Sequence, residues 1–438
     1  MLTAFRALLL SLFIAVAVVA AWGGEEGETD RAAGPAIERV PLSGSLREML
    51  EEVAAARKLE APDDLMLVAV PPEDVVEVYT GLFDEEDREA LQEGGALYQL
   101  LGYIQPDESY WDVTVSTAEL WIGFYSFDDK TLWVVTEEEE INVDTLSDQE
   151  RETLAHEMVH AIQDHNFGLR RSGRRLAPTL DAGLAWLSVI EGDAEFSTAL
   201  WRRLISVRPA GGVAGPVLLL GNVSQAQIDP QLLRAIWFPY VNGEIAVRNI
   251  ATRGGMVALN ALFAVPPPST AHILHPELLR SRWLPESVGH LLPAEAILER
   301  LGSDWVEAES GVLGEFHLVN YLLGDGSGYP WADGSGRETV AAGEGWRGDA
   351  YRIFEEGEEQ VMVVVVRFET ADDAGQFQAA HRRAVAPGDS VVEWPYIFVT
   401  RSDGFVVARV AHVGRTVFFA IGTNREVARE VLEAVEGR

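Results

Sequence analysis

The sequence places two histidines four residues apart, with a glutamate directly after the first. His156-Glu157-Met158-Val159-His160 forms the pattern His-Glu-x-x-His. In an α-helix, residues four apart lie on the same face, so both imidazoles can bind one metal ion with Glu157 beside them. Imidazole nitrogens are common zinc ligands, and a neighbouring carboxylate can act as a general base. The pattern therefore predicts a Zn²⁺ site with Glu157 as its catalytic base.

The surrounding residues predict this helix independently of the motif. Ser147 is a good N-cap, and Glu150 three residues later is placed to complete a capping box. Asn166 and Gly168 end the apolar periodicity. The apolar positions at helical spacing are Leu154, Met158, Ala161 and Ile162. Both histidines therefore fall in the middle of a helix, on a rigid support.

A catalytic zinc site needs a third protein ligand and leaves the fourth position open. Acidic residues interrupt the next apolar-periodic segment, 186 to 196. Glu191 is the predicted third ligand. Glu195, one turn further on the same face, can accept the second N–H of a ligating histidine and so select its tautomer. Gly192 has no side chain, so we expect the two helices to approach closely at the metal.

Each of these assignments has an ordinary structural alternative. Glu191 could be a capping or salt-bridged helix acid, in which case Glu195 would substitute for it as the ligand. Asp193 and Asp164 could support the ligands, or they could be solvated helix acids. The sequence does not decide between these alternatives.

The motif resembles the gluzincin, thermolysin-like class of zinc metallopeptidases, in which His-Glu-x-x-His is followed by a helical glutamate and then an acid four residues later. More of the chain resembles a largely uncharacterised group of secreted or surface-associated metallopeptidase-like proteins of bacteria and haloarchaea. The matching segments are 156 to 167, 190 to 194, 238 to 243, 254 to 263, 267 to 276 and 345 to 351. The resemblance implies a zincin-like core and a zinc-dependent hydrolase outside the cytoplasm.

The resemblance also gives roles to residues outside the motif. Residues 119 to 136 alternate as two strands, and in gluzincins the strand before the zinc helix is an open sheet edge that pairs with peptide substrate. A histidine or tyrosine beyond the third ligand donates to the oxyanion in that class, and His275 or Tyr240 is the counterpart here. Pro276 disfavours a helix at His275 and places it at a turn. The alternatives are a core hairpin and a histidine that closes a turn.

The fold class predicted for the chain is α+β, with a zincin-like catalytic core and a C-terminal α+β domain. The core is expected to have a sheet lobe and a helical lobe around the His-Glu-x-x-His helix. The predicted segments are a signal peptide (1 to 23), a flexible linker (24 to 40), a metallopeptidase domain (41 to 302, with sheet lobe 41 to 146 and helical lobe 147 to 302) and the C-terminal domain (303 to 438).

The first 23 residues carry the features of an export signal. Arg6 supplies a positive charge, an apolar core follows, and Ala21-Trp22-Gly23 is a small-x-small cleavage site. The apolar core is shorter than a membrane span, which favours cleavage over anchoring, and no later stretch is apolar enough to span a membrane. We therefore expect a secreted or extracytoplasmic protein, at the cell surface or in the periplasm.

Composition limits the partners and the ligands. The formal net charge is -35, so the surface repels phosphate backbones and we expect no nucleic acid partner. The chain has no cysteine, which excludes disulfides and thiolate ligands. Any bound metal must therefore use His, Asp or Glu. The expected partner is a peptide or protein substrate, and the oligomeric state is left open.

The predicted function is zinc-dependent peptide hydrolysis, in which a zinc-activated water attacks the scissile carbonyl and Glu157 accepts its proton. One alternative is hydrolysis of another amide or ester at the same site. Another is a surface or envelope binding protein that keeps zinc for structure. Glu157 favours the enzyme, because a structural site has no use for an acid next to its first histidine.

The purified mature protein is expected to hold one tightly bound zinc ion per molecule. His156→Ala and His160→Ala should each lose it, because each removes one of two ligands that the helix presents on one face. Metal analysis by atomic emission would check this. A metal-free native protein, or unchanged zinc content in both variants, would contradict the prediction.

Overall fold

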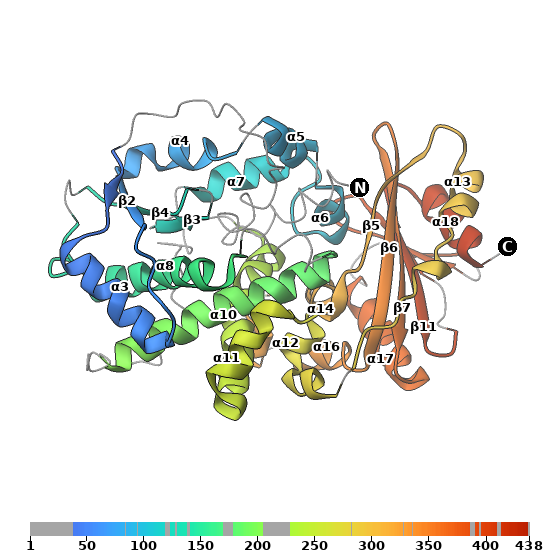
Figure 1. Ribbon diagram of the computed structural model, residues 1–438. Helices are drawn as coiled ribbons and strands as arrows, with labels where there is room; N and C mark the ends of the chain where they lie inside the picture. The colour runs from blue at the N-terminus through green and yellow to red at the C-terminus, as the bar shows by residue number, and fades with distance from the viewer. Residues whose placement is uncertain are drawn as a thin grey trace.

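The structure is a computed structural model that describes residues 38 to 436 with internal exceptions. The exceptions are 84, 94, 119 to 122, 128, 138 to 140, 170 to 177, 205 to 227, 282, 327, 335, 386 to 389, 394 to 395 and 410 to 412. The predicted signal and most of the predicted linker lie outside the described residues. Two β-sheets flank a group of long helices (Figure 1), which confirms the predicted α+β class.

The first sheet has four strands in the order β1-β2-β4-β3. Its strands are β1 (Val40–Pro41), β2 (Met66–Val70), β3 (Gly123–Ser126) and β4 (Thr131–Val135). Strand β2 pairs in parallel with β4, and β3 pairs antiparallel with the other side of β4. Strand β4, which precedes the His-Glu-x-x-His helix, is therefore internal, and the expectation that it is the open edge is wrong. The edge of the described sheet on this side is β3.

Short helices surround this sheet. They are α3 (Gly44–Arg57), η1 (Pro72–Asp74), α4 (Val75–Thr80), α5 (Glu85–Glu93), α6 (Ala96–Leu101) and α7 (Tyr110–Ala118). The sequence predicted two helices in residues 72 to 101, whereas the structure has three α-helices there. Gly95, with φ 137°, separates α5 from α6. Helices α4 and α7 lie over one face of the sheet, and α8 packs on the other face (Figure 1).

Helix α8 (Asp148–Phe167) carries the His-Glu-x-x-His motif and begins as predicted. The backbone N–H of Ser147 donates to Glu150 Oε2 at 2.7 Å, and that of Glu150 donates to Ser147 Oγ at 3.2 Å. These two bonds form a capping box and satisfy two N–H groups that have no partner within the helix. Gly168 ends the helix in the left-handed conformation, with φ 63°. The motif therefore sits in a helix with defined ends.

Two longer helices and several short ones follow α8. They are α10 (Leu180–Leu204), α11 (Pro230–Ala264), α12 (Ala271–Leu274), η3 (Pro276–Arg280), η4 (Gly289–Leu291) and α13 (Ala294–Leu301). The predicted break at Gly254-Gly255 is confirmed, because Gly255 adopts φ 69° and ψ -176° inside α11. Helix α10 packs against both α8 and α11. It therefore links the motif to the rest of the helical region.

Gly192 and Gly243 allow α10 and α11 to cross with their backbones in contact. A Cβ atom added to Gly192 would lie 2.2 Å from the carbonyl carbon of Gly243, and one added to Gly243 would lie 2.2 Å from Ser188 O. The close approach expected at Gly192 thus exists, but it is made with α11 and not with the metal-binding helix. It fixes α10 at the residue next to Glu191.

The second sheet has seven antiparallel strands in the order β5-β6-β7-β11-β10-β9-β8. The strands are β5 (Val306–Gly311), β6 (Trp346–Glu356), β7 (Glu359–Phe368), β8 (Ser390–Glu393), β9 (Tyr396–Thr400), β10 (Val406–Arg409) and β11 (Thr416–Gly422). The helices of this region are α14 (Gly314–Leu323), α15 (Pro330–Asp333), α16 (Arg337–Ala341), α17 (Ala371–Ala384) and α18 (Arg425–Glu436). The two outer strands, β5 and β8, were not predicted, because their residues are largely exposed and lack an apolar run.

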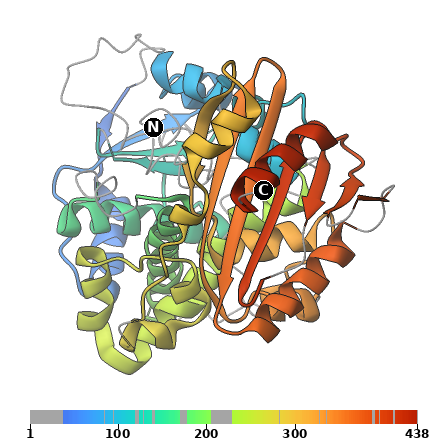
Figure 2. The same ribbon diagram turned by 90° about the vertical axis from the view of Figure 1, so that its right-hand side faces the viewer.

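Both faces of the second sheet are covered by helices. Strand β7 is a continuous apolar run whose alternate residues enter different cores, as a strand with a period of two requires. Val363 packs with Ile297 of α13 and Val431 of α18, whereas Val364 lies in the core on the other face, where α14 and α17 pack. Figure 2 shows α13 and α18 lying over one face of the sheet. Helix α13, which precedes the predicted boundary at residue 303, thus packs with the C-terminal sheet.

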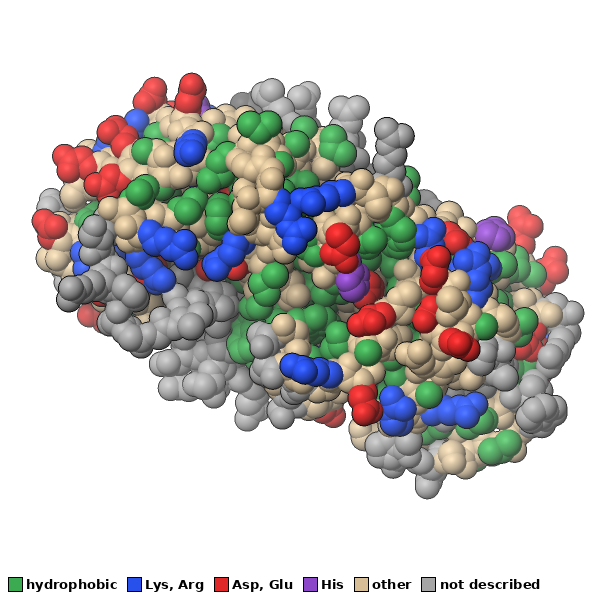
Figure 3. Space-filling model, turned by 90° about the horizontal axis from the view of Figure 1, so that it is seen from below, with side chains coloured by type: hydrophobic (Ala, Val, Ile, Leu, Met, Phe, Trp, Pro, Cys, Tyr) green, Lys and Arg blue, Asp and Glu red, His purple; other side chains and the backbone are tan. Residues whose placement is uncertain are grey.

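Charged side chains are spread over the surface. On the face in Figure 3, acidic side chains and arginines are interspersed among the described residues, and the basic side chains do not form one continuous surface. Among the described residues, no helix combines the length and the hydrophobicity that crossing a membrane requires.

Gly192→Ala is expected to lower the free energy of unfolding by about 1 to 3 kcal/mol or more, because its methyl group would overlap the backbone of Gly243 and force α10 away from α11. Urea unfolding followed by circular dichroism would measure the change. Gly289→Ala is the matched control, because a Cβ there would be 3.9 Å from the Cβ of Ala350. Equal stability of the two variants would contradict the packing described at this crossing.

Candidate metal centre

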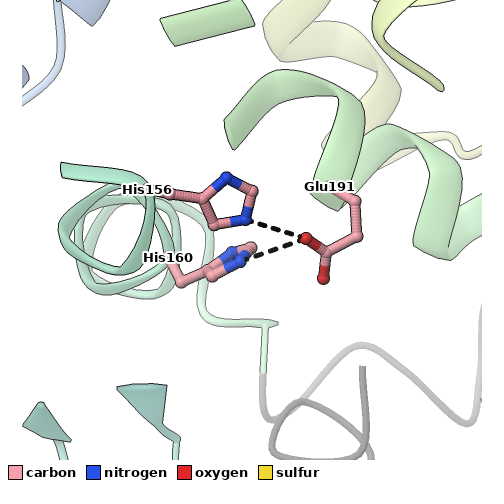
Figure 4. Close-up of side chains that lie close together, drawn as sticks. All are labelled: His156, His160 and Glu191. Carbon is pink, nitrogen blue, oxygen red and sulfur yellow. Dashed lines mark hydrogen bonds and ion pairs between the residues drawn. The ribbon is translucent and has the colours of Figure 1, made fainter. Parts of the chain in front are cut away.

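The metal centre candidate lies where α8 faces α10. His156 and His160 project from one face of α8, and Glu191 projects toward them from α10 (Figure 4). All three side chains are buried, with exposed fractions of 0%, 3% and 0%. Burial follows from the position of α8, which packs against α10, α3 and the first sheet. The structure thus brings together the three residues that the sequence predicted as ligands.

The three side chains converge on one carboxylate oxygen. Glu191 Oε2 lies 3.1 Å from His156 Nε2 and 3.3 Å from His160 Nε2. Ligand atoms bound tetrahedrally to zinc at about 2.0 to 2.1 Å are separated by about 3.3 Å. The spacing and the His₂Glu donor set therefore fit a zinc ion. Among the described residues, this is the one group of three or more possible ligands found within metal-binding range of one another.

The electrostatics of the group favour a positive charge at this point. Burial opposes protonation of His156, but hydrogen bonds to Glu191 and Glu195 outweigh it and raise the pKa of His156 to about 10. Burial opposes ionisation of Glu191, but the positive charge of His160 and the hydrogen bond from His156 lower the pKa of Glu191 to about 2. A metal cation competes with these protons, because its ligands must be deprotonated.

Glu195 lies at the other nitrogen of the His156 ring. Its Oε1 is 3.4 Å from His156 Nδ1, and the side chain is 7% exposed. An ionised carboxylate only accepts hydrogen bonds, so this position favours a proton on Nδ1 and leaves Nε2, which faces Glu191, as the nitrogen that would give up its proton to a metal. The structure therefore places Glu191 at Nε2 of both histidines and Glu195 at Nδ1 of His156, an arrangement compatible with the ligand roles that the sequence predicts.

Glu157 is buried beside the group and is held by the first sheet. Its Oε2 accepts a hydrogen bond from the backbone N–H of Tyr125 in β3 at 2.8 Å. Its Oε1 is buried and has no hydrogen-bond partner among the described residues. Burial, opposed by the positive charges of His160 and His156, raises the pKa of Glu157. A buried carboxylate oxygen without a partner is costly and is found at sites where chemistry uses it.

Tyr240 of α11 also reaches the candidate metal centre. Its ring stacks on that of His156, with 5.9 Å between centroids and 23° between planes. The side chain is buried. Burial, together with the negative charges of Glu191, Glu157 and Glu195, raises the pKa of the Tyr240 hydroxyl well above its ordinary value. The hydroxyl therefore remains a proton donor at neutral pH.

The structure does not bring His275 to the candidate metal centre. Its Nε2 is 2.9 Å from Glu315 Oε1 in α14, and its side chain is 35% exposed. The segment that carries it is tied to the start of α10, because the backbone N–H of Thr270 donates to Asp181 at 2.8 Å. Asp181 and Glu191 both lie on α10, about 15 Å apart along the helix axis. His275 does end α12 at a turn before Pro276, with φ -127° and ψ 73°, so the predicted turn is confirmed.

Sequence reasoning missed two residues near the centre. Gln163 Oε1 is 3.1 Å from His160 Nδ1, and Arg57 of α3 forms a fully buried ion pair with Asp193 at 2.7 Å. Gln163 follows His160 by three residues, so helical spacing could have identified it. Arg57 is 136 residues before Asp193, and no local pattern signals the pairing. Asp193 proves to be a buried supporting residue.

Comparisons with known proteins define only part of the chain. Residues 299–432 match the model of a family described as a domain of unknown function (DUF8575). The chain is also similar to the extracellular domain of PknH from Mycobacterium tuberculosis, at 15% identity and a TM-score of 0.23, over 35% of this chain and 99% of that one. No curated protein matches. None of these matches bears on the chemistry of the metal centre.

Removing Glu191 and removing Glu195 are expected to have different effects. Glu191→Ala deletes a metal ligand and should lose zinc affinity steeply. Glu195→Ala frees the His156 ring to reorient and should weaken the affinity roughly 10 to 100-fold. Zinc titration against a competing chelator would separate the two. If Glu195→Ala were the more damaging change, the ligand would lie one helical turn further along α10.

Proposed function

We propose that this chain is a zinc-dependent peptidase with a zincin-like core, acting outside the cytoplasm. The observation that supports it most directly is the buried convergence of His156, His160 and Glu191 with the carboxylate of Glu157 beside them. The resemblance of the motif to gluzincins agrees with this arrangement. The predicted export signal supports action outside the cytoplasm.

The ligand number favours a catalytic site over a structural one. Structural zinc sites are closed by four protein ligands, whereas catalytic sites use three and keep one position for water or substrate. The described residues offer three. Glu157 supports the same choice, because one of its oxygens has no structural partner among the described residues. A zinc site that served structure alone would not require that buried carboxylate.

His156, His160 and Glu191 would hold the metal, which when bound polarises a carbonyl and acidifies water. Glu157 Oε1 then accepts a proton from the attacking water, and the same carboxylate passes the proton to the leaving amine. Its other oxygen stays bonded to the Tyr125 N–H, which fixes the direction of the carboxylate. Tyr240 would donate a hydrogen bond from its hydroxyl to the oxyanion, a role for which its position against His156 suits it better than that of His275.

The position of β3 supports a peptide as the substrate. This strand forms the edge of the described first sheet, and the Tyr125 N–H that it directs away from β4 reaches Glu157. An extended chain that paired with edge groups of β3 other than the Tyr125 N–H, which Glu157 occupies, would pass the catalytic carboxylate. The strand that precedes α8 cannot take this role, because both of its sides are paired.

Glu157→Gln is expected to keep the metal and abolish turnover, because the amide fills the same space but cannot accept a proton. A library of mixed peptides incubated with zinc-loaded protein, followed by mass spectrometry, would measure cleavage. Activity that survived this substitution would place the base elsewhere. A wild-type protein that binds zinc but cleaves no peptide would favour another amide or ester as the substrate, or a structural role for the metal.

Tyr240→Phe should lower kcat roughly 100 to 1,000-fold with little change in zinc affinity, because it removes one donor to the oxyanion and keeps the ring. His275→Ala is the comparison variant and should leave kcat near the wild-type value, since His275 pairs with Glu315. Steady-state kinetics on a peptide cleaved by the wild type would decide between them. The reverse ranking would give the oxyanion role to His275.

A further inference from the structure

We propose that Arg57 sets the tautomer of the metal ligand His160 through a buried relay of Asp193 and Gln163. This inference rests on the proposed function, because it assumes that His160 binds a metal through Nε2. The relay crosses three helices, with Arg57 on α3, Asp193 on α10 and Gln163 on α8. All three side chains are fully buried. These are positioning residues, which act on the metal only through His160.

The nearest neighbour of His160 does not fix its tautomer, whereas that of His156 does. A neutral imidazole carries its proton on one nitrogen only, and the wrong tautomer has no lone pair to give to the metal. His156 faces the carboxylate of Glu195, which accepts a hydrogen bond from the Nδ1–H and cannot donate one when ionised. His160 Nδ1 instead faces the amide of Gln163, at 3.1 Å. An amide can turn either its oxygen or its nitrogen to the ring, so Gln163 alone does not select a tautomer.

The partners of Gln163 remove this ambiguity. Its Nε2 donates to Ile190 O and to Asp193 Oδ2, each at 3.0 Å. A carbonyl oxygen and an ionised carboxylate are both acceptors only. The amide nitrogen must therefore face α10, and the amide oxygen must face His160. His160 then carries its proton on Nδ1, and its Nε2 lone pair points to Glu191 and the metal position.

Arg57 holds the Asp193 carboxylate so that its other oxygen faces Gln163. Its Nε donates to Asp193 Oδ1 at 2.7 Å, and Ser197 Oγ donates to the same oxygen at 3.2 Å. The guanidinium is always charged and only donates. Its Nη2 also donates to Asn260 Oδ1 at 2.7 Å, which anchors it to α11. The guanidinium thus fixes the position of Asp193, and Asp193 together with Ile190 O fixes the direction of the Gln163 amide.

The relay predicts an unusual result for Asp193→Asn, which changes little in shape. The side-chain oxygen of the introduced asparagine should stay with Arg57, because Arg57 can only donate, and the new NH₂ would then face the NH₂ of Gln163. Turning the Gln163 amide would remove the acceptor from His160 Nδ1 and set its oxygen against Ile190 O, and keeping it would leave two NH₂ groups facing each other, so either response weakens the hold of Gln163 on His160. Zinc affinity should fall roughly 10 to 100-fold.

Removing the arginine as well should restore the site. In the double variant Arg57→Met with Asp193→Asn, the amide oxygen at position 193 is free to face Gln163, and its NH₂ can donate to Ser197 Oγ, which can also accept. Most of the lost zinc affinity should return. A role of Arg57 in packing alone predicts the opposite, because the second substitution would add to the damage of the first.

The experiment measures zinc affinity by chelator competition on folded wild-type and variant proteins, with ring-nitrogen NMR of the zinc-loaded forms to locate the His160 proton. Arg47→Met is the matched control, because Arg47 lies on the same helix and pairs with Glu51 and Asp63 near the surface. Its affinity should equal that of the wild type. Zinc affinity is expected to decrease in the order wild type, double variant, Asp193→Asn.

If Asp193→Asn does not fold, Gln163→Met tests the same relay, because it removes the acceptor from Nδ1 without changing Asp193. It too should bind zinc roughly 10 to 100-fold more weakly. Wild-type affinity in Gln163→Met or Asp193→Asn, or a double variant weaker than Asp193→Asn, would overturn the relay. A wild-type protein that binds no zinc would instead overturn the proposed function, so the two failures are distinguishable.

Discussion

The interior around His156 and His160 contains more negative than positive charge, and the rest of the site is organised by that imbalance. Glu157, Glu191, Glu195 and Asp193 are all buried there, and within the described part of the chain Arg57 is the one fully buried arginine paired with any of them. Buried carboxylates persist only when they are paired or bind metals. Arg57 neutralises Asp193, which leaves the other three to the histidines and to whatever cation binds between them. This excess of negative charge would favour a divalent cation at the proposed metal position.

The backbone contact at Gly192 and Gly243 determines where those charges lie. Because α10 touches α11 at the residue after Glu191, neither helix can slide without separating the two glycines. Tyr240 precedes Gly243 by three residues, so the same crossing also brings its ring onto His156. One close contact therefore positions the proposed metal ligand on α10 and the proposed hydrogen-bond donor on α11. Losing one partner of a buried charged pair costs about 3 to 5 kcal/mol. A shift of either helix that separated these charges would therefore lower the stability of the protein.

Local sequence signals predicted the motif helix and the residue of α10 that lies against both histidines, Glu191. The capping box at Ser147 and the break at Gly255 are short-range features, and the structure has both. Predictions that depended on long-range pairing did less well. The parallel pairing of β2 with β4 joins residues more than 60 positions apart in the chain and makes β4 internal. The sequence of the hairpin contains no local pattern that predicts this pairing. The buried pair of Arg57 and Asp193 was missed for the same reason.

His275 shows a further limit of local reasoning. The proline after it correctly predicted a turn, but a turn does not specify the direction in which a side chain points. That direction depends on Asp181, which holds Thr270 near the start of α10, and on Glu315, which pairs with the imidazole. Tyr240 lies within a helix, where spacing from Gly243 relates it to the crossing with α10. The direction of a side chain can thus be predicted better on a helix that contacts the site than at a turn, because the packing of the helix fixes where its side chains point.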